Sequence, residues 1–79
     1  MQKDEIRKKI IELTNSRYPK TICPSEVLPA DQKQNKEQME IVRKMACELA
    51  DENLIVIMQR QTIIDHKTIK GPIRLKKKD

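Results

Sequence analysis

The fold is decided by residues 36–60, KEQMEIVRKMACELADENLIVIMQR, where one pattern of apolar residues replaces another. In the first part, apolar residues recur at spacings of three, four and three, which places them on one helix face: Met39, Val42, Ala46 and Leu49. The continuous apolar run 54–58 follows, and it predicts a strand with apolar side chains on both faces. The stretch therefore predicts a helix at about 36–52, a stop near Asn53, and a largely buried strand at about 54–60.

A second helical pattern precedes this stretch, in the segment DEIRKKIIELTNS at residues 4–16. Ile6, Ile10 and Leu13 are spaced at i, i+4 and i+7, the repeat of an amphipathic helix. Pro19 cannot continue a helix, because proline lacks a backbone N–H. The pattern predicts a helix at about 4–16.

Between the two helical patterns lies the segment TICPSEV, residues 21–27. Pro24 suits the first position of a helix, where its missing N–H costs nothing. Cys23 would then be the N-cap, and Glu26 stands three residues later, where a capping box places its carboxylate. Pro29 limits the helix to one short piece, predicted at about 24–28.

The C-terminal segment GPIRLK alternates apolar and basic residues, which predicts a strand with one face turned inward. Ile73 and Leu75 are the inward residues, and Pro72 restricts the strand to an edge or to starting there. TIID at 62–65 fits either a second short strand or a loop. The order of elements predicts an α+β fold, a small winged helix-turn-helix. It has three helices (about 4–16, 24–28 and 36–52) and a β-hairpin wing (about 54–60 and 72–76) in one domain, 1–76, with a disordered basic tail, 77–79.

Two uninterrupted motifs, T-I-C-P-S-E-V and G-P-I-R-L, together resemble those of a small bacterial family known as a domain of unknown function, with a winged-helix-like fold. The resemblance covers nearly the whole chain and implies a fold, but no established activity. It implies a structural role for the motif residues Thr21, Cys23, Pro24, Ser25, Glu26, Gly71, Pro72 and Arg74.

Charge is distributed unevenly along the chain, whose net charge is +5. Residues 1–20 carry +3, residues 21–59 carry −3 and residues 60–79 carry +5, so an anionic partner should meet the C-terminal part first. The leading hypothesis is duplex-DNA binding, mainly by phosphate contacts from the wing and C-terminal segment. The candidate residues are Arg60, Lys67, Lys70, Arg74, Lys76, Lys77 and Lys78, with Lys36, Arg43 and Lys44 on the third helix.

Two other functions stay open. The domain could be a protein interaction or dimerisation module without a nucleic-acid role, using the acidic helix at 36–52. It could also be a thiol enzyme using Cys23, because a helix N-terminus lowers the pKa of a thiol. That enzyme needs a base, and His66 is the only histidine in the chain. We expect a non-enzymatic protein that uses no cofactor and no metal. Because the sequence contains no apolar run long enough to span a membrane and no export signal, we also expect a cytoplasmic protein without membrane association.

Overall fold

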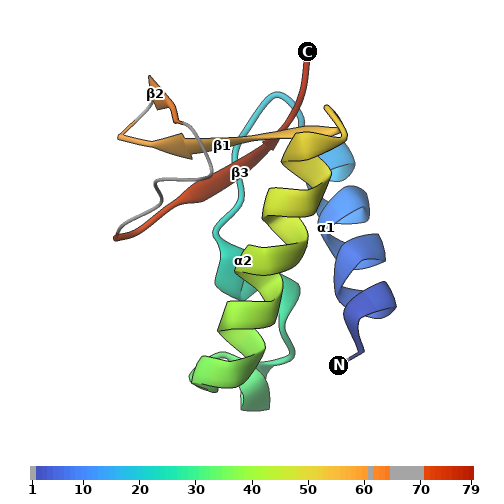
Figure 1. Ribbon diagram of the computed structural model, residues 1–79, viewed down its shortest axis with the longest axis vertical. Helices are drawn as coiled ribbons and strands as arrows, with labels where there is room; N and C mark the ends of the chain where they lie inside the picture. Colours follow the sequence, from blue (N-terminus) through green and yellow to red (C-terminus); the bar gives the residue numbers. More distant parts are fainter. Residues whose placement is uncertain (1, 61, 65–70) are drawn as a thin grey trace.

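The computed structural model describes residues 2–60, 62–64 and 71–79. Within these residues the chain forms two α-helices, two 3₁₀ turns and one three-stranded sheet (Figure 1). The elements are α1 (Lys3–Arg17), η1 (Pro24–Val27), η2 (Ala30–Gln32), α2 (Lys36–Asp51), β1 (Ile55–Gln59), β2 (Thr62–Ile63) and β3 (Arg74–Lys77). The predicted α+β class is correct.

Helix α1 covers the predicted segment and buries its apolar side. Ile6 and Ile10 are fully buried. Thr14 is also buried, and its hydroxyl is satisfied there because it donates to the Ile10 carbonyl at 2.8 Å. On the outer side, the Arg7 guanidinium donates to both carboxylate oxygens of Glu52 at 2.6 and 2.5 Å. This two-pronged pair joins α1 to the residue that follows α2.

The helix predicted at 24–28 is wrong, because Pro24–Val27 form only a 3₁₀ turn. The turn is closed by bonds between residues three apart, from the Leu28 N–H to the Ser25 carbonyl, for example, at 3.2 Å. Leu28 is extended (φ −92°, ψ 148°), as the steric demand of a following proline favours. The chain therefore leaves the helical region before an i→i+4 ladder can begin.

Helix α2 begins at the predicted position. The side chain of Asn35 caps it by accepting from the N–H groups of Glu37 and Gln38 at 3.0 and 3.2 Å. Its buried residues are Val42, Met45, Ala46 and Leu49. Asn53 follows in the left-handed region (φ 63°), which asparagine tolerates better than most residues, and the chain turns there into β1.

The sheet is antiparallel, with strand order β2-β1-β3. β1 pairs with β3, with Ile57 opposite Leu75, and this is the pairing expected for a wing made of strands at 54–60 and 72–76. However, β2 pairs with the other edge of β1. The predicted two-stranded hairpin is therefore wrong. Only residues 60 and 61 separate β1 from β2, a length typical of a tight hairpin connection, and Arg60 has the positive φ (52°) that such connections favour.

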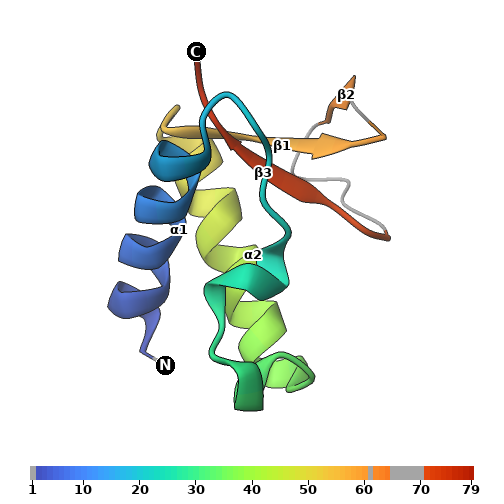
Figure 2. The ribbon, with the colours of Figure 1, turned by 180° about the vertical axis from the view of Figure 1, so that it is seen from behind.

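The helices and the sheet form two layers around one core. Figures 1 and 2 show α1 and α2 side by side beneath the sheet, with η1 against α2 on the side seen in Figure 2. The predicted winged helix-turn-helix with three helices and a two-stranded wing is overturned, since the described residues contain two α-helices and three strands. Fully buried side chains come from every layer, including Ile10, Ile22, Val42, Leu49, Ile57 and Leu75.

Candidate nucleic-acid interface

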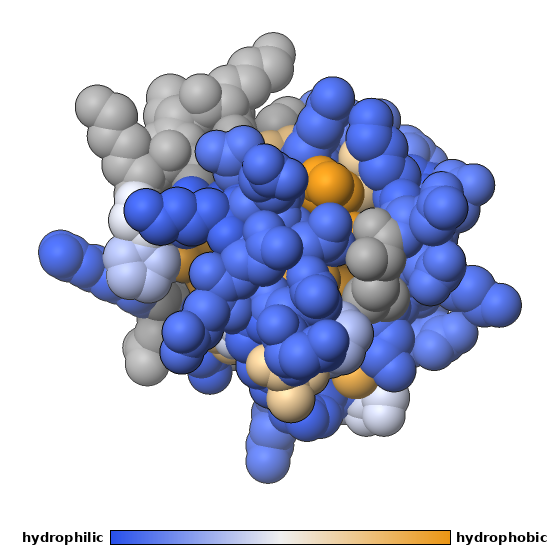
Figure 3. Space-filling model, turned by 90° about the horizontal axis from the view of Figure 1, so that it is seen from below, coloured by the Kyte–Doolittle hydropathy of each residue, from blue (hydrophilic) through white to orange (hydrophobic). Residues whose placement is uncertain are grey.

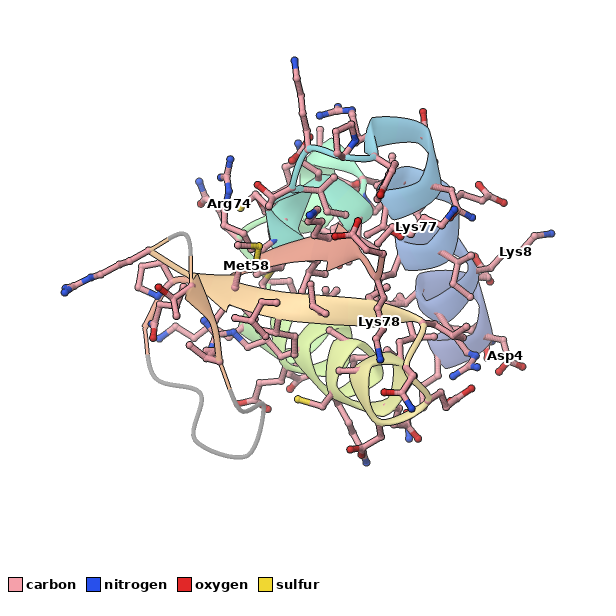
Figure 4. All side chains as sticks on the ribbon, turned by 90° about the horizontal axis from the view of Figure 1, so that it is seen from above. Asp4, Lys8, Met58, Arg74, Lys77 and Lys78 are labelled. Carbon is pink, nitrogen blue, oxygen red and sulfur yellow. The ribbon has the colours of Figure 1, made fainter. Side chains whose placement is uncertain are left out.

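Strand β3 carries basic side chains on the side of the sheet turned away from the helices. Ile73 and Leu75 are buried at 3% and 0% exposure, and they alternate with the exposed Arg74 and the half-buried Lys76, as the sequence pattern predicts. Figure 4 looks onto this side of the sheet and places Arg74 beside β3. The basic residues of β3 are therefore accessible to a ligand.

Apolar side chains of the neighbouring strands share this side. Residues opposite one another in antiparallel strands project to the same face, and Val56 lies opposite Lys76, whereas Met58 lies opposite both Arg74 and Ile63. Val56 and Met58 are half-buried and Ile63 is 63% exposed. We call this surface the outer face, made of Val56, Met58, Ile63, Arg74 and Lys76.

The end of the chain lies against the end of α1 through Tyr18. The Tyr18 hydroxyl donates to the Asp79 carboxylate, and this bond raises the pKa of Tyr18 and lowers the pKa of Asp79. The amino groups of Lys76 and Lys77 lie 5.9 and 5.4 Å from the ring centroid, within cation–π range. β3 extends to Lys77, and so into the segment 77–79 for which the sequence predicts disorder.

The predicted basic residues before β3 lie in different places. Arg60 lines an open hollow of about 330 Å³ at the end of β1, together with Gln59, Gly71, Pro72 and Arg74. Gly71 has φ 79°, a conformation that side chains disfavour. Lys67 and Lys70 lie outside the described residues.

The three basic residues of α2 do not join the outer face as one surface. Lys36 is the first residue of α2, at the end of the helix away from the sheet in Figure 1, and Lys44 is exposed along the helix. Arg43 alone reaches the segment before β3, where its guanidinium donates to the Gly71 carbonyl at 3.0 Å. The structure thus gives Arg43 a role in positioning that segment.

The two motifs, far apart in the sequence, touch in the fold. Ile22 and Leu75 exchange backbone hydrogen bonds of 2.7 and 2.8 Å, and Arg74 Nε donates to the Thr21 hydroxyl at 3.2 Å. Residues 21–22 therefore continue the sheet beyond β3. This contact places the two motifs side by side in the fold.

Glu26 secures the start of η1. Its carboxylate accepts from the Cys23 N–H at 2.7 Å and pairs with Arg17 at 3.1 Å. The backbone hydrogen bond and, to a lesser degree, the charge of Arg17 lower the pKa of Glu26. Pro24 is buried at the first position of the turn. These contacts match the capping arrangement expected from the spacing of Cys23 and Glu26.

The cysteines lie in different surroundings. The half-buried Cys23 thiol is 3.3 Å from the Ser25 hydroxyl, and its proposed base, His66, lies outside the described residues. Burial, with the nearby charge of Asp51, raises the pKa of Cys47, which favours its neutral thiol. Across residues 2–60, 62–64 and 71–79, no three His, Cys, Asp or Glu side chains gather as a metal site would require.

Reasoning from the sequence missed the apolar part of the outer face. The apolar run 54–58 predicts a strand that is largely buried, yet Val56 and Met58 share the face of Arg74 and Lys76. The alternation within GPIRLK, applied across to β1, is the signal that could have found them. In the part of the chain that the structure describes, no helix has both the length and the apolar character needed to cross a bilayer.

Comparison with known proteins adds a family. A search of curated proteins gives no match. The family model described as "Protein of unknown function (DUF3253)" matches residues 3–78, a span that contains the two helices and three strands of the described residues and both motifs. The chain therefore belongs to this family of proteins of unknown function.

Proposed function

We propose that the domain binds nucleic acid through phosphate contacts made by the basic residues of β3 and the chain beyond it. The observation that carries the proposal is the presence of Arg74 and Lys76 on one face of the sheet, two residues apart. Side chains at this spacing in a strand are about 6.8 Å apart. Successive phosphates of an extended strand are separated by a similar distance, so a backbone can follow β3.

The charge around β3 supports binding to a polyanion. Residues 60–79 contain seven basic and two acidic side chains. Asp79, one of the two acids, pairs with Lys76 at 3.6 Å, but Lys77 and Lys78 add further positive charge at the same end of the sheet. Neutralisation of phosphates by such residues releases counterions, which supplies most of the affinity in nonspecific binding.

The end of the molecule opposite the sheet, seen from below in Figure 3, is covered mainly by hydrophilic side chains, with small and separate apolar areas. Helix α2 is a poorer candidate for phosphate contacts than β3, because residues 36–52 carry three basic and five acidic side chains. Because acidic side chains repel phosphate, we do not expect α2 to read base edges. Duplex DNA is the ligand expected from the sequence, and the same phosphates occur in single strands.

Fluorescence anisotropy with labelled duplex and single-stranded oligonucleotides over a salt series tests the proposal. Arg74→Gln and Lys77→Gln should each weaken binding similarly for all sequences and reduce the slope of log K against log salt by about 1. The matched control is Lys8→Gln, which removes the same charge from α1 on the side away from the strands (Figure 4).

The control should leave the salt slope nearly unchanged. An equal loss in all three variants would reduce the interaction to diffuse charge attraction, and absence of binding at low salt would disprove the proposal. Binding to a protein partner that persists at high salt would instead support the interaction module.

A further inference from the structure

The outer face contains a small hollow with an apolar floor. Its volume is about 210 Å³, and its lining residues are Val56, Met58, Ile63, Lys76, Lys77, Lys78 and Asp79. The strand register explains the arrangement, because Met58 lies opposite Ile63 on one side and Val56 lies opposite Lys76 on the other. We call this feature the apolar hollow.

The floor of the apolar hollow is only partly covered by the protein itself. Ile63 is 63% exposed and Val56 and Met58 are half-buried, although residues of the same kind on the inner face, Ile55 and Ile57, are 2% and 1% exposed. Covering exposed apolar side chains is favourable in proportion to the apolar area removed from water. The apolar hollow therefore offers binding energy to a ligand that has its own apolar surface.

The rim limits the chemistry of that ligand. Three lysines and one aspartate line the apolar hollow, so the rim is positive, and Figure 4 shows Lys78 over the start of β1 and Lys77 on the side nearer α1. A fitting ligand combines an uncharged, apolar group with negative charges beside it. A nucleobase attached to its phosphates has this combination. The thioether of Met58, in the floor, suits such a ligand, because methionine sulfur makes favourable contacts with aromatic rings.

Tyr18 adds an aromatic surface next to the rim. Tyr18 is 44% exposed, and its ring lies within cation–π range of Lys76 and Lys77, which line the apolar hollow. Base stacking on exposed rings stabilises complexes with single strands. Tyr18 thus provides a place for a neighbouring base.

We infer that the apolar hollow receives an unpaired base, so that the nucleic acid bound by this domain is single-stranded. The inference rests on the proposed function and names its ligand class. In a duplex both faces of each base are covered by stacked neighbours, and exposing one requires that the base be unpaired and unstacked. A single strand presents its bases without that requirement, while its phosphates contact Arg74 and the lysines of the rim.

Three oligonucleotides of equal phosphate number separate this inference from simple charge attraction: an oligothymidine, a duplex, and a single strand of abasic sites. Anisotropy at one salt concentration should show the oligothymidine binding about tenfold more tightly than the abasic strand and the duplex. Equal affinities would overturn the inference and leave the proposed function standing, whereas no binding of any of the three at low salt would overturn both.

The variant Ile63→Thr tests the floor directly. It should lower affinity for oligothymidine about threefold to fivefold, leave the abasic strand unaffected and keep the salt slope, because it removes apolar contact but no charge. The matched control is Leu54→Thr, since Leu54 is 45% exposed and lies outside the lining of the apolar hollow.

Circular dichroism should show both variants folded. Unchanged oligothymidine affinity in folded Ile63→Thr would overturn the inference. Binding of an acidic apolar peptide without binding of any oligonucleotide would overturn both the inference and the proposed function.

Discussion

Glu26 shows how one side chain can hold a short turn, and its effect should depend on pH. Its carboxylate bonds to the Cys23 N–H and pairs with Arg17, and these contacts lower its pKa below the ordinary value of 4.5. A carboxyl group with a lower pKa in the folded chain stabilises the fold above its unfolded pKa. This contribution is lost as the pH falls through the folded pKa.

We therefore expect Glu26→Gln to lower the free energy of unfolding by about 1 kcal/mol at pH 7. The difference from the wild type should vanish below the folded pKa, where the wild-type carboxyl is itself neutral. Urea unfolding followed by circular dichroism at pH 7 and at several acidic pH values measures this. Glu12→Gln, on the exposed side of α1, is the control, and an equal, pH-independent loss in both variants would contradict the expectation.

At the scale of elements, the contact between the two motifs should contribute strongly to stability. Ile22 is fully buried and its backbone pairs with Leu75, although it belongs to no named strand. Ile22→Ala should lower the free energy of unfolding by about 2–4 kcal/mol, because it leaves a cavity beside β3. Ile63→Ala, the same change at a 63% exposed position, should cost less than about 1 kcal/mol. Similar losses in urea titrations of the two variants would show that burial of Ile22 is not what holds these motifs together.

The elements also show which information the sequence holds locally. α1 and α2 were predictable because a helix repeats its apolar positions within a few residues, as Ile6 and Ile10 do. β2 has only two residues, too few to show an alternation of apolar and polar side chains. Its position at the edge of the sheet depends on pairing with β1, which lies outside its own segment. The kind of turn at η1 depended on the conformation imposed on Leu28 by the next proline.

The candidate site could also be predicted from the sequence only in part. The outward positions of Arg74 and Lys76 follow from alternation with buried Ile73 and Leu75, and the sequence predicted them. The exposure of Ile63 did not follow, since a short apolar segment does not reveal which face of a sheet lacks a covering layer. Only the positions of the helices, both on the inner side of the sheet, decide that (Figure 1).

At the scale of the whole molecule, the two basic parts of the chain meet. Residues 1–20 carry +3 and residues 60–79 carry +5, and the hydrogen bond between Tyr18 and Asp79 holds their ends together. Helix α2, which carries most of the acidic side chains of the middle segment, lies beside α1 in the layer below the sheet. A ligand on the outer face therefore meets the basic residues of β3 before it meets the acidic α2.

This arrangement makes the C-terminal residues part of the fold as well as of the candidate site. Lys76 and Lys77 pair with Val56 and Ile55 in the sheet, and the Lys78 N–H donates to the Leu54 carbonyl at 3.3 Å. A chain ending at Leu75 loses these interactions, worth about 1–2 kcal/mol together. We expect its Tm to fall by about 5–15 °C.

Replacing Lys76, Lys77 and Lys78 by Gln keeps the backbone pairing and removes the charges, together with the cation–π contacts to Tyr18 and the hydrogen bond from Lys78 to Asn53. These side-chain contacts and the ion pair between Lys76 and the exposed Asp79 lie at the surface and contribute little, so the Tm of this triple variant should stay within about 4 °C of the wild type. Oligonucleotide binding should fall in both proteins, as measured by anisotropy beside thermal unfolding. Because only the triple variant separates charge from strand pairing, it decides whether these lysines bind phosphate. If it bound as tightly as the wild type, the residues after Leu75 would serve the sheet alone.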